Sequence, residues 1–206
     1  TYLADGNWSE AVDSLRQVME ESGDRLLPIS SNRYVTTRTL CHLKLVDFPP
    51  EALQLYRDLV DPIAGQWYEA WKTQRDRAAL ERIVDEAFAS RWGDDALSAL
   101  GEALFQEGHY AAARAYWQRI LPFEPPDGTK RTWLSFPDTD KDLAEVRARL
   151  VMLSIFEGRI DEAESQLAQF ERLHPNARGR LGGRDVPLAD ALKELIQASR
   201  TWPDLP

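Results

Sequence analysis

The stretch LSALGEALFQEGHYAAARAYWQRILPFEP, residues 97–125, decides the fold. A helical pattern of apolar residues lies on each side of Gly108, and Pro125 closes the second one. Glycine permits the left-handed backbone that ends one helix and reverses the chain, and proline stops the next helix. The small residues Gly101 and Ala113 let two helices approach closely, at a cost of about 1 kcal/mol in helix propensity at the glycine. The stretch therefore predicts an antiparallel pair of helices.

The same spacing recurs around Gly6 and Gly158. In each case a large apolar residue follows the glycine by two positions, an alanine by five and a bulky residue by nine. That bulky residue lies one helical turn beyond the alanine, where it fills the next space between helices. Gly6 and Gly108 are 102 residues apart, three periods of about 34, so a degenerate unit is expected between them. Gly158 follows Gly108 by 50 residues, one period plus an insertion of about 16.

These positions resemble the tetratricopeptide repeat (TPR) family, whose unit of about 34 residues is a helix–turn–helix. The matching residues are Leu97, Leu100, Gly101, Leu104, Gly108, Tyr110, Ala113, Trp117 and Pro125 in one unit, and Leu150, Gly158, Ala163, Leu167 and Pro175 in the last. Val151 departs from the pattern, because it replaces the small residue of its helix. The resemblance implies an all-α fold, a right-handed α-solenoid of helical hairpins. The alternative is an ordinary helical hairpin with an alanine-rich seam.

We expect one solenoid over residues 1–206. Its repeat-like units are expected at about 1–22, 62–92, 94–125 and 140–175. Residues 122–139, rich in proline, form an insertion, and residues 176–186 form a loop or short hairpin. A helix at 187–200 covers the open end of the stack. Residues 201–206 look like the start of a linker.

The region between the first and third units predicts four helices. Residues 36–47 form the first, and Pro50 lies in the first turn of the second. Asp61-Pro62 begins the third, and residues 76–90 form the fourth. The last two helices make the degenerate pair, which has no turn glycine.

Three further stretches carry a second resemblance. They are RYV and CH followed by LVDFPPEALQLYR within residues 33–57, VDE to RWGDDAL within residues 84–97, and LGGR at residues 181–184. Together they resemble the N-terminal helical region of large bacterial proteins that continue into a PQQ-like β-propeller. The resemblance implies an exported protein, in the periplasm or cell envelope. No blade pattern follows Trp202, so neither quinone binding nor dehydrogenase chemistry carries over.

Composition limits the choice of partner. The net charge is -9, from 34 acidic and 25 basic residues, whereas nucleic-acid binding needs cationic side chains. No apolar run approaches the roughly 20 residues that span a bilayer, so no membrane insertion is expected. The single cysteine, Cys41, excludes an internal disulfide and a cysteine-cluster zinc site.

The sequence yields no catalytic set. His42, His109 and His174 lack a metal-binding spacing with any other His or Cys. The acids at 138, 140 and 142 resemble the start of a calcium loop, but Leu143 and Arg149 stand where glycine and an acid are needed. The glycines and arginines of 178–184 could bind a phosphate through backbone donors, and a flexible basic turn is the simpler interpretation. We expect no metal, no cofactor and no enzyme activity.

The first helix of each TPR unit lines a concave face. Counting back from Gly108 and Gly158 places these residues there: Asp95, Ser98, Glu102 and Phe105, and Glu145, Ala148, Met152 and Ile155. TPR proteins that grip a chaperone tail carry Lys and Asn at such positions, and none occurs here. An acidic and apolar groove favours a basic or apolar segment, such as one helix. Alternatively, the insertion fills the groove from within, with Trp133 and Phe136 as plugs.

Two functions follow from these patterns. The first is a non-catalytic scaffold module within a larger protein, which binds a protein or peptide or the downstream domain of its own polypeptide. The second is an accessory helical domain of an enzyme, or of a PQQ-like β-propeller protein, whose active centre lies outside this chain.

Overall fold

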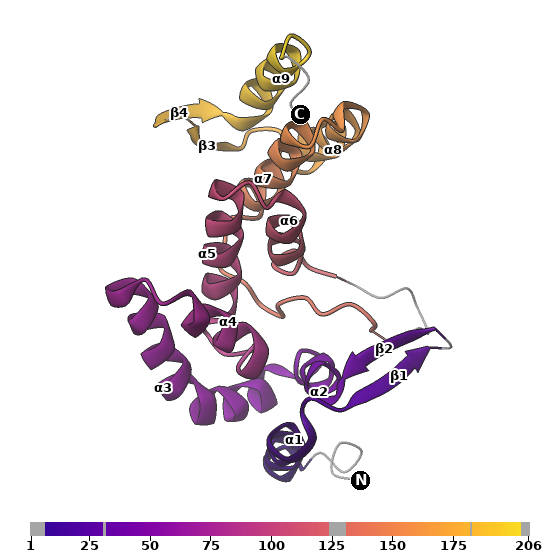
Figure 1. Ribbon diagram of the computed structural model, residues 1–206, viewed down its shortest axis with the longest axis vertical. Coiled ribbons are helices and arrows are strands. Elements are labelled where there is room, and N and C mark those ends of the chain that lie inside the picture. The colour runs from indigo at the N-terminus through magenta and orange to yellow at the C-terminus, as the bar shows by residue number, and fades with distance from the viewer. Residues whose placement is uncertain (1–6, 31, 124–130, 182, 203–206) are drawn as a thin grey trace.

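A computed structural model describes residues 7–30, 32–123, 131–181 and 183–202. Gly6, Pro125 and residues 203–206, which the sequence analysis uses, lie outside these ranges. The described chain is mostly helical, and its helices pack as sequential pairs along the long axis of the molecule (Figure 1). Its helices are α1 (Trp8–Ser22), α2 (Thr37–Leu45), α3 (Pro50–Gln74), α4 (Arg77–Glu86), α5 (Gly93–Gln106), α6 (Tyr110–Gln118), α7 (Leu143–Phe156), α8 (Ile160–Leu173) and α9 (Leu188–Ser199).

The turn glycines behave as the sequence predicts. Gly108 (φ 80°) joins α5 to α6, and Gly158 (φ 71°) joins α7 to α8. Between α3 and α4, Arg75 takes the left-handed conformation instead (φ 57°), with its N–H 2.9 Å from the carbonyl oxygen of Trp71. A non-glycine residue there costs about 1–2 kcal/mol. The degenerate pair, α3 with α4, is therefore closed without a turn glycine, as expected.

The prediction of a new helix at Asp61-Pro62 is wrong. Pro62 lies inside α3, which continues without a break for 25 residues. The carboxylate of Asp61 accepts a hydrogen bond from the backbone N–H of Arg91 at 3.0 Å, so it caps no helix. Tyr56 and Ala64, on either side of the proline, are fully buried. This burial offsets the roughly 3 kcal/mol that an internal proline costs.

Two antiparallel hairpins accompany the helices. The first, β1 (Leu26–Ser30) with β2 (Arg33–Thr36), was not predicted, and the second, β3 (Arg178–Leu181) with β4 (Arg184–Pro187), confirms the loop or short hairpin expected there. Each hairpin connects two helices in the same way. The first N–H of the following helix bonds to a carbonyl just before the hairpin, from Thr37 to Arg25 at 2.8 Å and from Leu188 to Ala177 at 3.0 Å.

Residues 131–142, which include residues 131–139 of the insertion and precede α7, contact α3 and α5, and we call them the strap (Figure 1). Phe136 is buried, with its ring centroid 6.1 Å from that of Phe88, and its N–H donates to the carbonyl oxygen of Arg119 at 2.7 Å. Trp133 is only half-buried. Phe136 is therefore part of the hydrophobic core beside Phe88 and the start of α5, whereas Trp133 stays partly accessible.

Two hydrophobic clusters share α7. Val146, Leu150 and Leu153 join the cluster that runs back to α1. Val151 and Ile155 join a second cluster with α8 and α9. Apolar side chains lie on more than one side of α7, which is why this helix contributes to both cores. The helix at 187–200 is present as α9, and it packs on α7 and α8 as a cover should.

Candidate binding groove

A groove of about 400 Å³ opens between α5, α7 and the start of α9. We call it the central groove. It is lined by Glu102, Phe105, Trp117, Glu145, Ala148, Arg149, Met152, Arg180 and Leu188. Two carboxylates and two guanidinium groups thus surround an apolar floor.

Five of the eight residues predicted for the concave face line the central groove. They are Glu102 and Phe105 on α5, and Glu145, Ala148 and Met152 on α7. The structure thus brings residues 43 positions apart in sequence, Glu102 and Glu145, to one groove.

The other three predicted residues lie outside the groove. Asp95 forms an ion pair with Lys141 of the strap, at 2.6 Å. The carbonyl oxygen of Ser98 accepts a hydrogen bond from the Trp117 indole at 3.3 Å. Ile155 is 1% exposed and lies in the cluster that contains Leu192 of α9. The strap therefore covers the start of the α5 face, and α9 covers the end of the α7 face.

The groove is of mixed charge, and not acidic and apolar as the sequence suggested. Arg149 lies four residues after Glu145, so helical spacing alone places both on one side of α7. Its guanidinium carbon is 5.5 Å from the centroid of the Trp117 ring, a cation–π contact. Arg180 comes from β3, so helical periodicity gives no signal for it.

The floor of the groove depends on Gly101. A Cβ atom at this position would lie 2.3 Å from Nε1 of Trp117. The missing side chain lets the indole ring lie against α5, as the small residue at this position predicts. Trp117 is 1% exposed, so a buried indole ring forms part of the floor of the groove.

A row of aromatic rings runs from the groove toward the end of the described chain. Phe105 and Phe156 have ring centroids 5.6 Å apart, and Phe156 stacks on Trp202 at 5.7 Å. Tyr110 also stacks on Phe156, at 5.9 Å. Trp202 remains 38% exposed. The row ties the turns of both helix pairs to the segment that follows α9.

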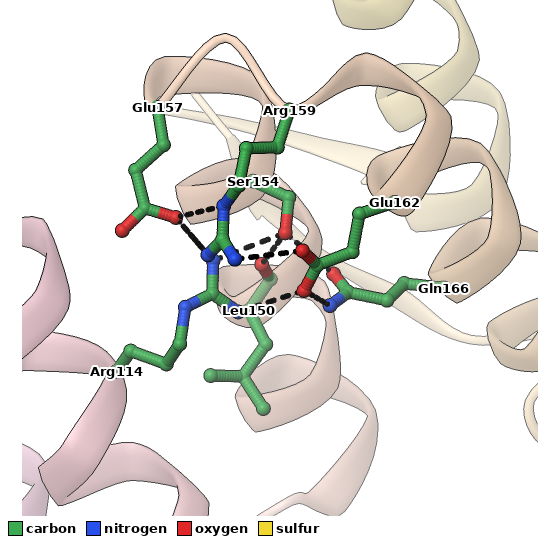
Figure 2. Close-up of polar contacts among 7 residues, drawn as sticks. All are labelled: Arg114, Leu150, Ser154, Glu157, Arg159, Glu162 and Gln166. Atoms are coloured by element: carbon green, nitrogen blue, oxygen red, sulfur yellow. Dashed lines mark hydrogen bonds and ion pairs between the residues drawn. The ribbon is translucent and has the colours of Figure 1, made fainter.

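A polar network fixes α6 against α7 and α8 (Figure 2). Arg114 donates to the Ser154 hydroxyl at 3.0 Å and to Glu157 at 2.7 Å. Arg159 also binds Glu157, and it pairs with Glu162 at 2.7 Å. Burial alone would raise the pKa of Glu157, but hydrogen bonds from Arg159 and Arg114 outweigh it and lower the pKa. The carboxylate therefore stays ionised at the junction of the two helix pairs.

The described residues contain no group of three or more His, Cys, Asp or Glu side chains arranged to hold a metal ion. His42 is buried in the first cluster and bonds through Nε2 to the carbonyl oxygen of Asp85 at 2.8 Å. His109 is exposed, 3.9 Å from Glu107. Among the helices that the structure describes, none is long and apolar enough to cross a membrane.

No family model, curated protein or solved structure matches this chain. Over the residues that the structure describes, the fold is mostly helical, with consecutive helix pairs, two short hairpins and a mixed-charge groove.

Proposed function

We propose that this chain is a non-catalytic, TPR-like scaffold module whose central groove binds a protein segment. The observation that carries the proposal is the groove itself. Four residues chosen from the spacing of two turn glycines lie along it: Glu102, Phe105, Glu145 and Met152.

The proposed fold is a right-handed α-solenoid. Its support is the order of packing, since α3 with α4, α5 with α6 and α7 with α8 form successive antiparallel pairs, and α9 packs on the last pair. In repeat proteins each unit contacts its neighbours, and this stacking leaves an extended concave surface for a partner.

The proposed occupant is an amphipathic segment, most simply one helix. Its apolar side would contact Phe105 and Met152, as helices do in hydrophobic grooves. Its charged residues would include both signs, because Glu102 and Glu145 attract cations whereas Arg149 and Arg180 attract anions. Such complementarity sets orientation and specificity more than affinity.

Peptide selection tests this proposal. Peptides that bind the wild-type chain are selected from a displayed random library, and their affinities are measured by calorimetry against Met152→Arg. Met152 is half-buried in the groove, so an arginine there obstructs the apolar floor. We expect at least a tenfold loss of affinity.

The matched control is Leu173→Arg, which places the same charge on an exposed apolar residue of α8 outside the groove. Its affinities should equal those of the wild type. Peptides that bind both variants as well as the wild-type chain would contradict a role for the groove.

A second candidate is the accessory helical domain of an enzyme or of a PQQ-like β-propeller protein. It is favoured by the LGGR stretch at 181–184, of which Leu181 ends β3 and Arg184 begins β4, in the hairpin that carries Arg180 of the groove; Gly182 lies outside the described residues. The groove would then hold another part of the same polypeptide. Hydrogen exchange at α5 and α7, compared between this segment and the full-length gene product, tests it. Unchanged exchange in the longer protein would argue against this candidate.

A further inference from the structure

A second hollow, of about 190 Å³, lies between α6, α7 and α8. We call it the Arg147 crevice. Arg114 and Gln118 reach it from α6, Arg147 from α7, and Gln166 and Gln169 from α8. Arg147 lies five residues before Met152, on the side of α7 turned away from the central groove. The crevice therefore shares no lining residue with the groove.

The charge of Arg147 is not compensated by the described residues. Its Nε is buried without a hydrogen-bond partner, and no ion pair to its guanidinium occurs in the described parts of the chain. Burial lowers the pKa of Arg147, and no carboxylate counters this effect. The side chain as a whole is half-buried, and its Nε–H is the buried part. A buried N–H donor without a hydrogen-bond partner costs free energy, so such groups are usually paired.

The neighbouring charges leave an excess of positive charge. Arg114 and Arg159 are matched by Glu157 and Glu162, so the three arginines with Arg147 exceed the two glutamates by one. This occurs in a chain whose net charge is -9. The charge of Arg147 also acts on His174, whose pKa is lowered by burial and by Arg147, whereas the carboxylate of Asp142 acts in the opposite direction.

Free donors also gather in the crevice. Nε and Nη1 of Arg114 are buried without hydrogen-bond partners, as is Nε of Arg147. A guanidinium presents several N–H groups in a planar fork that matches a carboxylate or a phosphate. The volume is several times the roughly 30 Å³ that a water molecule occupies. Leu150 and Phe170 line the same hollow and offer an apolar contact beside the donors.

We propose that the Arg147 crevice is a binding site for an oxyanion, the phosphate or carboxylate group of a small ligand. Arg147 supplies the charge, and Arg114, Gln118 and Gln169 lie within the same hollow to supply further N–H donors. The site is independent of the central groove, so either proposal can fail without the other.

The test follows the Nε–H resonances of the arginines by NMR during titration at constant ionic strength. Inorganic phosphate, acetate and chloride are added in separate experiments to the wild-type chain, to Arg147→Gln and to Arg172→Gln. Arg172 is an exposed arginine on α8 and serves as the matched control. We expect phosphate or acetate to shift the Nε resonances of Arg147 and Arg114 saturably, and the affinity read from the Arg114 resonance to fall at least tenfold in Arg147→Gln only.

Each outcome decides a point. Saturation by phosphate alone assigns a phosphate ligand, and saturation by acetate assigns a carboxylate. Shifts that are linear, or equal for chloride, would overturn the proposal. Without ligand, Arg147→Gln should unfold at the same urea concentration as the wild type or higher, because it removes an unpaired charge. A clear loss of stability in that variant would instead indicate a structural role and also overturn the proposal.

Discussion

Gly101 has no side chain, and any side chain at this position would collide with the ring of Trp117. Alanine is favoured over glycine in a helix by about 1 kcal/mol, but an added methyl group in a packed core costs about 1–3 kcal/mol. The 2.3 Å separation from Nε1 makes the clash the larger effect. The gain in helix propensity offsets part of the clash, so we predict that Gly101→Ala lowers the free energy of unfolding by up to about 2 kcal/mol, as measured in urea.

Gly65→Ala is the control for this prediction. Gly65 also lies inside a helix and beside an indole, but there the nearest atom, Nε1 of Trp92, would be 3.0 Å away. We expect a change within about 0.5 kcal/mol for this variant, typical of a tolerated site. A stabilised Gly101→Ala would show that Trp117 can move away from α5.

His42 gives a prediction for pH. Its burial lowers its pKa to about 4, although the hydrogen bond to the carbonyl oxygen of Asp85 acts in the opposite direction. The positive charges of Arg119 and Arg38 lower the pKa further. Between pH 6.5 and about 4 the unfolded chain binds a proton at His42 and the folded chain does not. Folding stability must therefore fall as the pH falls through this window.

The size of this effect is up to about 3 kcal/mol, from a difference of about 2.5 pKa units at 1.36 kcal/mol each. Urea unfolding of the wild type and His42→Gln at a series of pH values measures it. The difference between the two proteins isolates His42 from the carboxylates. His109→Gln, an exposed histidine, should follow the wild-type curve. Parallel curves for the wild type and His42→Gln would refute the prediction.

Among the elements, the strap is attached to α3 by the ion pair between Asp138 and Arg57. Arg57 donates to both carboxylate oxygens of Asp138, at 2.6 and 2.7 Å, and its Nε donates to the carbonyl oxygen of Ala89 at 3.0 Å. Breaking a fully buried pair costs about 3–5 kcal/mol, but the Asp138 side chain is 51% exposed, so solvent screens it. We predict that Asp138→Ala costs about 1–2 kcal/mol and speeds proteolysis within 131–142.

Asp140→Ala is the control for the strap. Asp140 lies two residues further along, its side chain is 89% exposed, and it is 3.4 Å from Lys141. This variant should change stability by less than about 0.5 kcal/mol and leave the proteolysis rate unchanged. Equal effects of the two substitutions would mean that the pair to Arg57 does not hold the strap.

The elements that could be predicted from sequence are those with a local cause. The turns at Gly108 and Gly158 need a left-handed residue, and the sequence shows it. The hairpin β1–β2 could not be predicted in this way, because Pro28 interrupts its short strand and its pairing with β2 leaves no periodic pattern. The prediction that a helix begins at Pro62 failed for a related reason. The burial of Tyr56 and Ala64, which keeps α3 continuous through the proline, is a tertiary effect that the local sequence does not show.

The same distinction applies to the site. Glu102, Phe105, Glu145 and Met152 could be chosen by helical spacing, because both helices present one face to the groove. Asp95 was misplaced because its partner Lys141 lies in the irregular segment between the insertion and α7, whose path no repeat pattern describes. Arg180 was missed because it depends on where the second hairpin folds back.

For the molecule as a whole, the two clusters predict two regions of unfolding. Leu192 is 1% exposed in the second cluster, and cutting it to alanine should cost about 2–5 kcal/mol. We predict that Leu192→Ala accelerates amide exchange in α8 and α9, whereas α3 and α4 keep the protection of the wild type. Hydrogen exchange with mass spectrometry measures both regions at once. Equal acceleration everywhere would show a single cooperative unit.

Leu80→Ala is the reciprocal variant, because Leu80 is fully buried in the first cluster. It should accelerate exchange in α3 and α4 more than in α9. The amides of α7 should respond to both substitutions, since this helix contributes side chains to each cluster.

Because α7 contributes side chains to both hydrophobic clusters, the protein cannot be divided at this helix into two independently folded fragments. A polypeptide cut between α6 and α7 would leave Leu150 and Leu153 bare on one fragment and their former neighbours bare on the other. Each fragment should aggregate when it is purified alone, and the two fragments should reassemble when they are mixed. A split-reporter assay could therefore divide this chain immediately before α7. Packing of α7 against the first cluster would then reassemble the two fragments.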